Sequence, residues 1–214
     1  MEKNNGKIIA VVALVVAVVA LSVGFAAFAD TLTIDGTATV KEGANTFAPN
    51  FGYAASPAAT CTYTGGGAID GTYEAGTASG NTWSGISVPL TTDHPSVTCT
   101  ATIENTSAYN ASLTSIKASG APTCNSGTAT NTTAVCNTVT ETVQIGSASN
   151  QMVVNKDTGA NQTISSGLNL TVNKTNGTAT VTVIIAYDAA TVTPDGDITV
   201  TLPTITHDYT TVAD

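Results

Sequence analysis

The sequence predicts an all-β protein: an antiparallel β-sandwich or jelly-roll-like domain, preceded by one N-terminal hydrophobic helix. Thr accounts for 41 of the 214 residues, all from residue 31 onward. Thr is β-branched and favours strands over helices. Many short segments alternate apolar residues with Thr, which is the period of a half-buried strand, and no window after residue 30 has a helical period.

The charge balance excludes two classes of protein. Charged residues make up only 10% of the chain, and 6 Lys stand against 15 Asp plus Glu, a formal net charge of −9. So few cations cannot neutralise many phosphates, so we expect no nucleic-acid partner. Hydrophobic residues make up 42%, which is too much for disorder driven by charge repulsion.

Residues 1–29 indicate export. Lys3 and Lys7 precede an apolar run over 8–28, which ends in the A-x-A pattern of residues 27–29. We interpret 1–29 as a signal peptide cleaved after Ala29. The run is also long enough to span a bilayer, so a retained membrane anchor stays open. A third possibility is cleavage after Gly6, leaving a type IV pilin-like helix, although no Glu follows at the fifth position of that chain. Each version places the remainder outside the cell, secreted or at the cell surface.

Residues 30–214 are expected to form a single domain of about ten strands. The first runs from Thr31 to Val40, with one face formed by Leu32, Ile34, Ala38 and Val40 and the other by Thr31, Thr33, Thr37 and Thr39. Nine further strands are predicted, at 58–64, 85–90, 96–104, 109–117, 138–146, 168–174, 178–187, 197–202 and 204–210. Residues 65–84 are rich in Gly, Thr and Ser and are expected to form a long surface loop. The segments 168–173 and 178–187 are expected to pair as a hairpin around Asn176 and Gly177.

The four cysteines agree with export, because no C-x-x-C pair is present and disulfides persist outside the cytosol. Strand parity places Cys99 on the same face as Val97 and Ile103, and Cys61 on the same face as Tyr63. Cys136 falls outside the apolar parity of Val135, Val139, Val143 and Ile145. We therefore predict a core bridge, Cys61–Cys99, and a surface bridge, Cys124–Cys136.

Three segments carry a resemblance to a known family. The stretch 24–34 (GFAAFADTLTI), followed by Phe47 and Phe51, resembles the start of TasA/camelysin-like exported proteins with a SipW-type signal peptide. Segments 98–116 and 177–188 resemble the middle and the late strand of the same β-sandwiches. The resemblance covers about half of the chain. It implies a jelly-roll-like extracellular protein, a fibre subunit of the biofilm matrix, and joining of subunits by an N-terminal strand.

Candidate catalytic and metal sites have simpler explanations. Ser84, Asp93 and His94, or His207 with Asp208, contain the residue types of a triad, but no G-x-S-x-G motif is present. No H-E-x-x-H motif is present either, so the protease activity described for camelysin is not transferred. The segment 195–197 lacks the further ligands of a calcium loop and reads as a turn. We expect no catalytic residues, no cofactor and no metal.

Seven sequons mark possible glycosylation sites. They begin at Asn105, Asn110, Asn131, Asn161, Asn169, Asn173 and Asn176. Trp83, in the expected loop region, could form the aromatic platform of a carbohydrate-binding adhesin.

The expected function is that of a non-enzymatic exported structural protein, a subunit of an extracellular fibre or of a cell-surface or biofilm matrix. The expected polymerisation strand is Thr31–Val40, added to an open sheet edge of another copy. A membrane-anchored or pilin-like subunit and a carbohydrate-binding adhesin are the alternatives. Residues 30–214 contain 4 Lys and 14 acids, a net charge of −10. That charge repels anionic polymers and envelopes unless cations screen it, which favours contacts with itself, with cations or with neutral glycans. A contact with the cell envelope or a glycan stays open, and a membrane contact is expected only through 8–28 if that segment is retained.

Overall fold

The computed structural model describes residues 51–126, 128–156 and 162–212, all within the compact unit Glu42–Asp214. The predicted N-terminal helix and the predicted strand Thr31–Val40 lie outside the described residues. Within them the chain is mostly β, arranged as antiparallel sheets, which confirms the all-β prediction. No helix among the described residues has the length and apolarity needed to cross a membrane.

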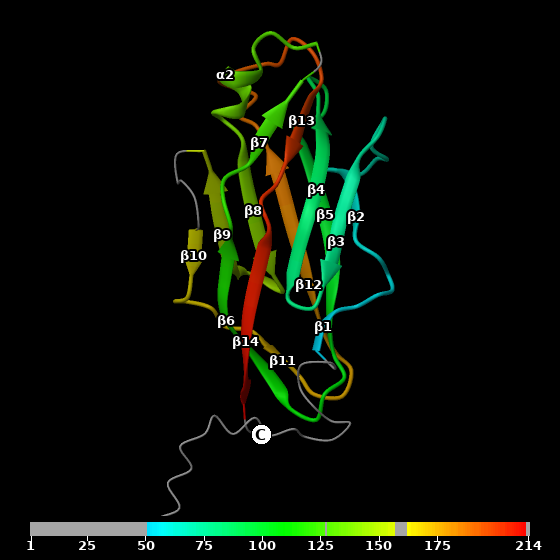
Figure 1. Ribbon diagram of the computed structural model, residues 1–214, viewed down its shortest axis with the longest axis vertical. Helices are drawn as coiled ribbons and strands as arrows, with labels where there is room; N and C mark the ends of the chain where they lie inside the picture. The colour runs from blue at the N-terminus through cyan, green and yellow to red at the C-terminus, as the bar shows by residue number, and fades with distance from the viewer. Residues whose placement is uncertain (1–50, 127, 157–161, 213–214) are drawn as a thin grey trace, which may run out of the picture. The chain divides into compact units, whose positions relative to one another are not determined.

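One layer is a six-stranded sheet with the order β1-β5-β12-β8-β9, and β2 also pairs with β5 (Figure 1). Its strands are β1 (Phe51–Tyr53), β2 (Thr60–Tyr63), β5 (Ser96–Asn105), β8 (Thr140–Ile145), β9 (Ser147–Asn155) and β12 (Gly177–Ala186). The central pair is β5 with β12, in register over ten residues from Asn105↔Gly177 to Ser96↔Ala186.

The other layer is an eight-stranded sheet with the order β10-β6-β14-β4-β13-β7, in which β11 pairs with β6 and β3 with β4. Its strands are β3 (Glu74–Ser79), β4 (Thr82–Leu90), β6 (Asn110–Ala118), β7 (Thr123–Asn125), β10 (Gln162–Ile164), β11 (Thr171–Val172), β13 (Ile198–Thr201) and β14 (Ile205–Val212). A five-residue helix, α2 (Thr132–Cys136), precedes β8.

The core lies between the two sheets and takes side chains from both. The period of two places these side chains, because alternate residues of a strand point to opposite faces. The buried residues include both predicted inward sets, which are Val97, Cys99, Ala101 and Ile103 of β5 and Val181, Val183, Ile185 and Tyr187 of β12 and its end. Thr occupies most outward positions of the same strands.

Two sequence predictions are wrong. The expected loop 65–84 contains β3 and the start of β4, which pair with each other around Gly80. The expected hairpin of 168–173 with 178–187 does not form, since β11 pairs with β6 in one sheet while β12 pairs with β5 and β8 in the other. Thr175 and Asn176 have φ of 59° and 69°, and this turn carries the chain from one sheet to the other.

Candidate functional site

The first described strand, β1, contacts both sheets. It pairs with the end of β5, from Phe51↔Asn105 to Tyr53↔Ile103. The Tyr53 N–H donates to the Gly80 carbonyl in the β3–β4 turn at 2.9 Å. Gly52 has φ of 153°, and a Cβ placed there would lie 2.6 Å from the Gly80 oxygen. Only glycine therefore permits this approach of β1 to the β3–β4 turn.

Aromatic side chains strengthen the same junction. Phe51 packs on Tyr209 of β14 with ring centroids 4.5 Å apart, and Tyr53 meets His207 at 4.9 Å and Trp83 at 5.9 Å. The ring nitrogens of His207 and the hydroxyls of Tyr53 and Tyr209 are buried without a hydrogen-bond partner among the described residues. Burial raises the pKa of both tyrosines and lowers the pKa of His207 to about 4.

The six-stranded sheet ends at β9, which is nine residues long and has β8 as its neighbour. Val153 on β9 is 43% exposed, the largest value among the large hydrophobic side chains of the described residues. A terminal strand presents backbone N–H and C=O groups that can pair with another strand. On the other side, the sheet ends at the short strands β1 and β2.

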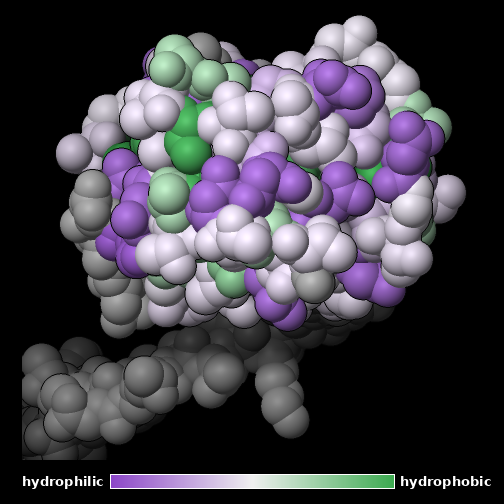
Figure 2. All heavy atoms as spheres, turned by 90° about the horizontal axis from the view of Figure 1, so that it is seen from above, coloured by the Kyte–Doolittle hydropathy of each residue, from purple (hydrophilic) through white to green (hydrophobic). Residues whose placement is uncertain are grey.

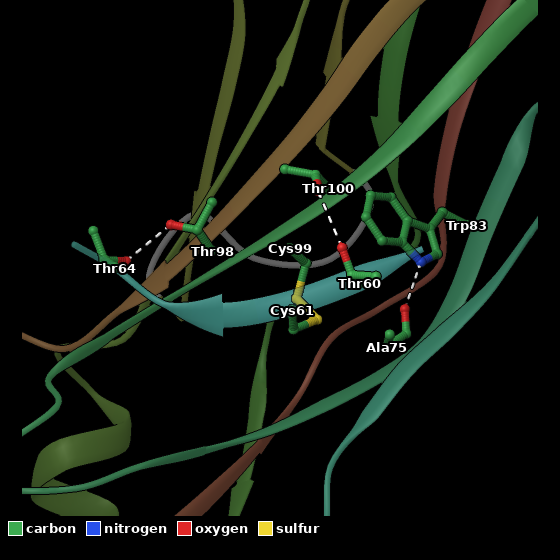
Figure 3. The surroundings of a disulfide bond; sticks show 8 residues. All are labelled: Thr60, Cys61, Thr64, Ala75, Trp83, Thr98, Cys99 and Thr100. Atoms are coloured by element: carbon green, nitrogen blue, oxygen red, sulfur yellow. Dashed lines mark hydrogen bonds between the residues drawn. A yellow bond between two sulfur atoms is a disulfide. The ribbon is translucent and has the colours of Figure 1, made fainter. Parts of the chain in front are cut away.

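Both disulfide bonds have the predicted pairing. Cys61 and Cys99 are direct cross-strand neighbours in β2 and β5, with Cα atoms 4.0 Å apart, and both are buried (Figure 3). Cys124 of β7 and Cys136 of α2 have Cα atoms 5.8 Å apart. This second bridge lines an open hollow of about 540 Å³, together with Lys156. Two disulfides fit an oxidising compartment.

The candidate triad residues do not come together around His207. Its ring nitrogens have no hydrogen-bond partner in the described part of the chain, and the Asp208 carboxylate instead accepts from Ser115 Oγ at 2.7 Å and from Lys117 Nζ at 2.5 Å. These contacts lower the pKa of Asp208, with the Lys117 hydrogen bond as the main cause. His94 stacks on Tyr63, with ring centroids 3.8 Å apart.

The 195–197 segment acts as a turn. The Asp195 carboxylate accepts from the backbone N–H and the hydroxyl of Thr130 and from the Asn131 N–H, and these hydrogen bonds lower its pKa. Across the described ranges, no group of three or more His, Cys, Asp or Glu side chains is arranged to hold a metal ion.

Two predicted surface residues are in fact buried. Trp83 is 0% exposed, and its indole N–H donates to the Ala75 carbonyl at 2.8 Å (Figure 3), so it cannot form a carbohydrate platform. Asn105 is also 0% exposed, and its amide donates to the carbonyls of Tyr109 and Val172. A glycan cannot be attached to Asn105 in this fold.

The remaining sequons divide by exposure. The exposed ones are Asn169, Asn173 and Asn176. The half-buried ones are Asn110 and Asn131. Asn161 lies outside the described residues.

Glu141 is a buried ionisable residue that the sequence reasoning missed. It lies on β8, opposite Val154 of β9 and Ile185 of β12. It is 0% exposed, and its carboxyl oxygens have no hydrogen-bond partner among the described residues. Burial raises its pKa to about 8. The strand alternation could have predicted its burial, since Glu141 lies on the same face as Val139 and Val143.

No family model matches the chain, and no curated protein matches its sequence.

Proposed function

We propose that this protein is a non-enzymatic, exported structural subunit of an extracellular fibre or cell-surface matrix. In this proposal Thr31–Val40 of one copy adds as a strand to an open sheet edge of the next. The observation that carries the proposal is the terminal place of β9, a nine-residue strand that pairs only with β8 among the described residues. The predicted donor segment, with ten residues, has a matching length. Strand addition gains main-chain hydrogen bonds along the whole contact.

The position of the donor segment also supports the proposal. It precedes β1 in the sequence, and β1 is fixed to both sheets through Gly52, Tyr53 and the ring contacts at β14. A tensile force on the chain before β1 would therefore be resisted by contacts with both sheets, and not only by the hydrogen bonds of one edge strand. The Cys61–Cys99 bridge ties the neighbouring strand β2 to β5 in the same region.

Two measurements test the proposal. N-terminal sequencing of the purified protein should find a start at Asp30, whereas an intact 8–28 segment would favour the anchored or pilin-like alternatives. Electron microscopy of the secreted protein should then find fibres, and deletion of residues 30–40 should abolish them while thermal unfolding of the monomer stays unchanged. Fibres that survive the deletion would refute strand donation.

A matched pair of single variants sharpens the test. Ile34→Asp places a charge on the predicted inward face of the donor strand, and Thr33→Asp places the same charge on the outward face. Fibre yield should fall strongly for the first and little for the second, because only the inward side chain enters the acceptor core. Equal effects would mean that the segment does not pair as an alternating strand.

A further inference from the structure

The outward face of the six-stranded sheet carries almost no charge. Within the described strands of this sheet the charged residues are Glu141, which is buried, and Glu104, which lies near the end of β5. The acids lie mainly elsewhere, including the loops with Asp93, Asp188 and Asp195. Figure 2 views the end of the domain that carries α2 and shows a mainly polar surface with a few small apolar spots. Apart from Glu104 at one end, the sheet face is therefore a neutral area on an acidic protein.

This face also presents one row of β-branched side chains across five strands. The register aligns Thr62 of β2 with Thr98 of β5, Thr98 with Ile184 of β12, Ile184 with Thr142 of β8, and Thr142 with Val153 of β9. β-branched side chains are stiff at χ1, so little conformational freedom is lost when such a surface is covered. Val153, the last of the row, is the exposed apolar residue noted above.

Several hydroxyls on the face already have partners. The hydroxyls of Thr60 and Thr100 are hydrogen-bonded at 3.4 Å, and those of Thr64 and Thr98 at 2.9 Å (Figure 3). The Thr64 hydroxyl is also hydrogen-bonded to Ser96 Oγ at 2.8 Å. Hydroxyls that are hydrogen-bonded to each other cost less to remove from water than unpaired ones. The face thus carries little charge, its side chains have few rotamers, and little free energy is needed to remove it from water.

We propose that this face docks against the same face of a second copy and holds neighbouring fibres side by side. A second copy is the favoured occupant because the protein has a net charge of −9, so its copies repel each other wherever their acidic surfaces meet. Two neutral faces can approach without that penalty. Sheets stack face to face about 10 Å apart when their side chains interlock. The proposal rests on the proposed function, since it concerns fibres.

The size of the face explains why the contact would act between fibres and not between monomers. Five strands spaced about 4.8 Å apart give a width of roughly 20 Å, and about five residues of each strand give a similar length. Each copy would bury on the order of 400 Å², well below what a stable dimer needs. Fibres repeat the contact along their length, so many weak contacts add up.

Bead clumping tests the face independently of strand donation. The purified secreted chain is attached to beads through a C-terminal tag, which presents many copies at once. Wild-type beads should clump, and more so when added salt screens the acidic repulsion. Thr62 and Val153 are exposed positions at the two ends of the row. Beads that carry the double variant Thr62→Glu and Val153→Glu should clump at least roughly tenfold less than wild-type beads. The matched control carries Thr199→Glu and Thr201→Glu, exposed positions of β13 in the other sheet, and should clump like wild type.

Further variants guard against misfolding and separate the two proposals. Beads that carry Thr62→Lys and Val153→Lys should clump with beads that carry the Glu pair, which a merely unfolded variant would not do. Wild-type beads that stay dispersed, or Glu-pair beads that clump like wild type, would overturn the docking face. Clumping without fibres in the electron microscope would overturn strand donation, and the contact would then be one between copies and not between fibres.

Discussion

Tyr53 and His207 meet edge to face, with ring centroids 4.9 Å apart, although Tyr53 belongs to the six-stranded sheet and His207 to the eight-stranded one. The contact fixes β1 to the opposite layer of the sandwich. Tyr53 and Tyr209 face the imidazole, and the adjacent Asp208 carboxylate is held by Ser115 and Lys117. His207 is therefore buried as a neutral ring, with a pKa of about 4.

Acid should destabilise the protein through His207. Its pKa is about 4 when folded and about 6.5 when unfolded, so the unfolded chain binds the proton more readily. Stability is then lost as the pH falls from about 6.5 to about 4, by roughly 3 kcal/mol. His207→Phe, which keeps a ring against Tyr53, should lack this contribution. Its free energy of unfolding, measured in urea, should therefore fall more steeply than that of wild type as the pH rises from about 4.5 to 6.5. An unchanged acid slope in that variant would mean that His207 is protonated in the fold.

Alkali should destabilise the protein through Glu141. Its pKa is about 8 when folded and about 4.5 when unfolded, so the folded chain holds the proton more tightly. This contribution to stability is then lost as the pH rises from about 4.5 to about 8, on the order of 5 kcal/mol in all. Glu141→Gln should lose this decline and be more stable than wild type at pH 8. Equal stability of the two proteins at that pH would contradict a buried, unpartnered carboxyl.

The two effects oppose each other, which makes the single variants diagnostic. Between about pH 4.5 and 6.5 they largely cancel, so wild type should have a plateau there and lose stability at higher pH. Glu141→Gln should expose the acid decline of His207, and His207→Phe should expose the alkaline decline of Glu141. Urea unfolding from pH 4.5 to 8.5 covers both ranges. A wild-type curve that falls steadily through the plateau would show that one of the two groups does not titrate as described.

The central strands could be predicted because their side chains follow one simple rule. In β5 and β12 the inward residues are apolar and the outward ones mostly Thr, so parity alone gave the core and the Cys61–Cys99 bridge. The same rule places Glu141 and Asn105 inside. Their burial was not predicted because both side chains are polar, and polar side chains are usually assigned to the surface even where the strand alternation places them inside.

Other elements depend on tertiary contacts that leave little local signal. β3 and β9 are rich in Gly, Ala, Ser and Asn, which are poor strand formers, and they exist because β4 and β8 offer an edge to pair with. The expected hairpin failed because Thr175 and Asn176 turn the chain toward the other sheet, which no spacing of apolar residues reveals.

Asn105 should be important for stability. Its amide donates to the carbonyls of Tyr109 and Val172, and its side-chain oxygen accepts from the N–H and the hydroxyl of Ser107. Asn105→Ala leaves several buried backbone groups unpaired, so we expect a loss of about 2–4 kcal/mol in the free energy of unfolding. Asn173→Ala, at an exposed sequon, is the control and should change little. A loss for Asn105→Ala no larger than that of the control would contradict the described network.

The two disulfides should differ in their access to reductant. Cys61 and Cys99 are 3% and 0% exposed, so their bridge should open only when the sandwich unfolds. Cys124 and Cys136 line an open hollow and should be reduced while the fold is intact. Mild reduction followed by alkylation and mass spectrometry should label the second pair at least roughly a hundredfold faster.

Removal of the accessible bridge should then be tolerated. The bridge spans a sequence separation of 12 residues, so the double variant Cys124→Ser and Cys136→Ser should lose about 3 kcal/mol and still fold. The matched change, Cys61→Ala with Cys99→Ala, adds the loss of packed core atoms to the loss of the cross-link, and should cost more. Equal labelling of all four cysteines under native conditions, or a larger loss for the surface pair, would mean that β2 does not hold Cys61 against β5 in the core as described.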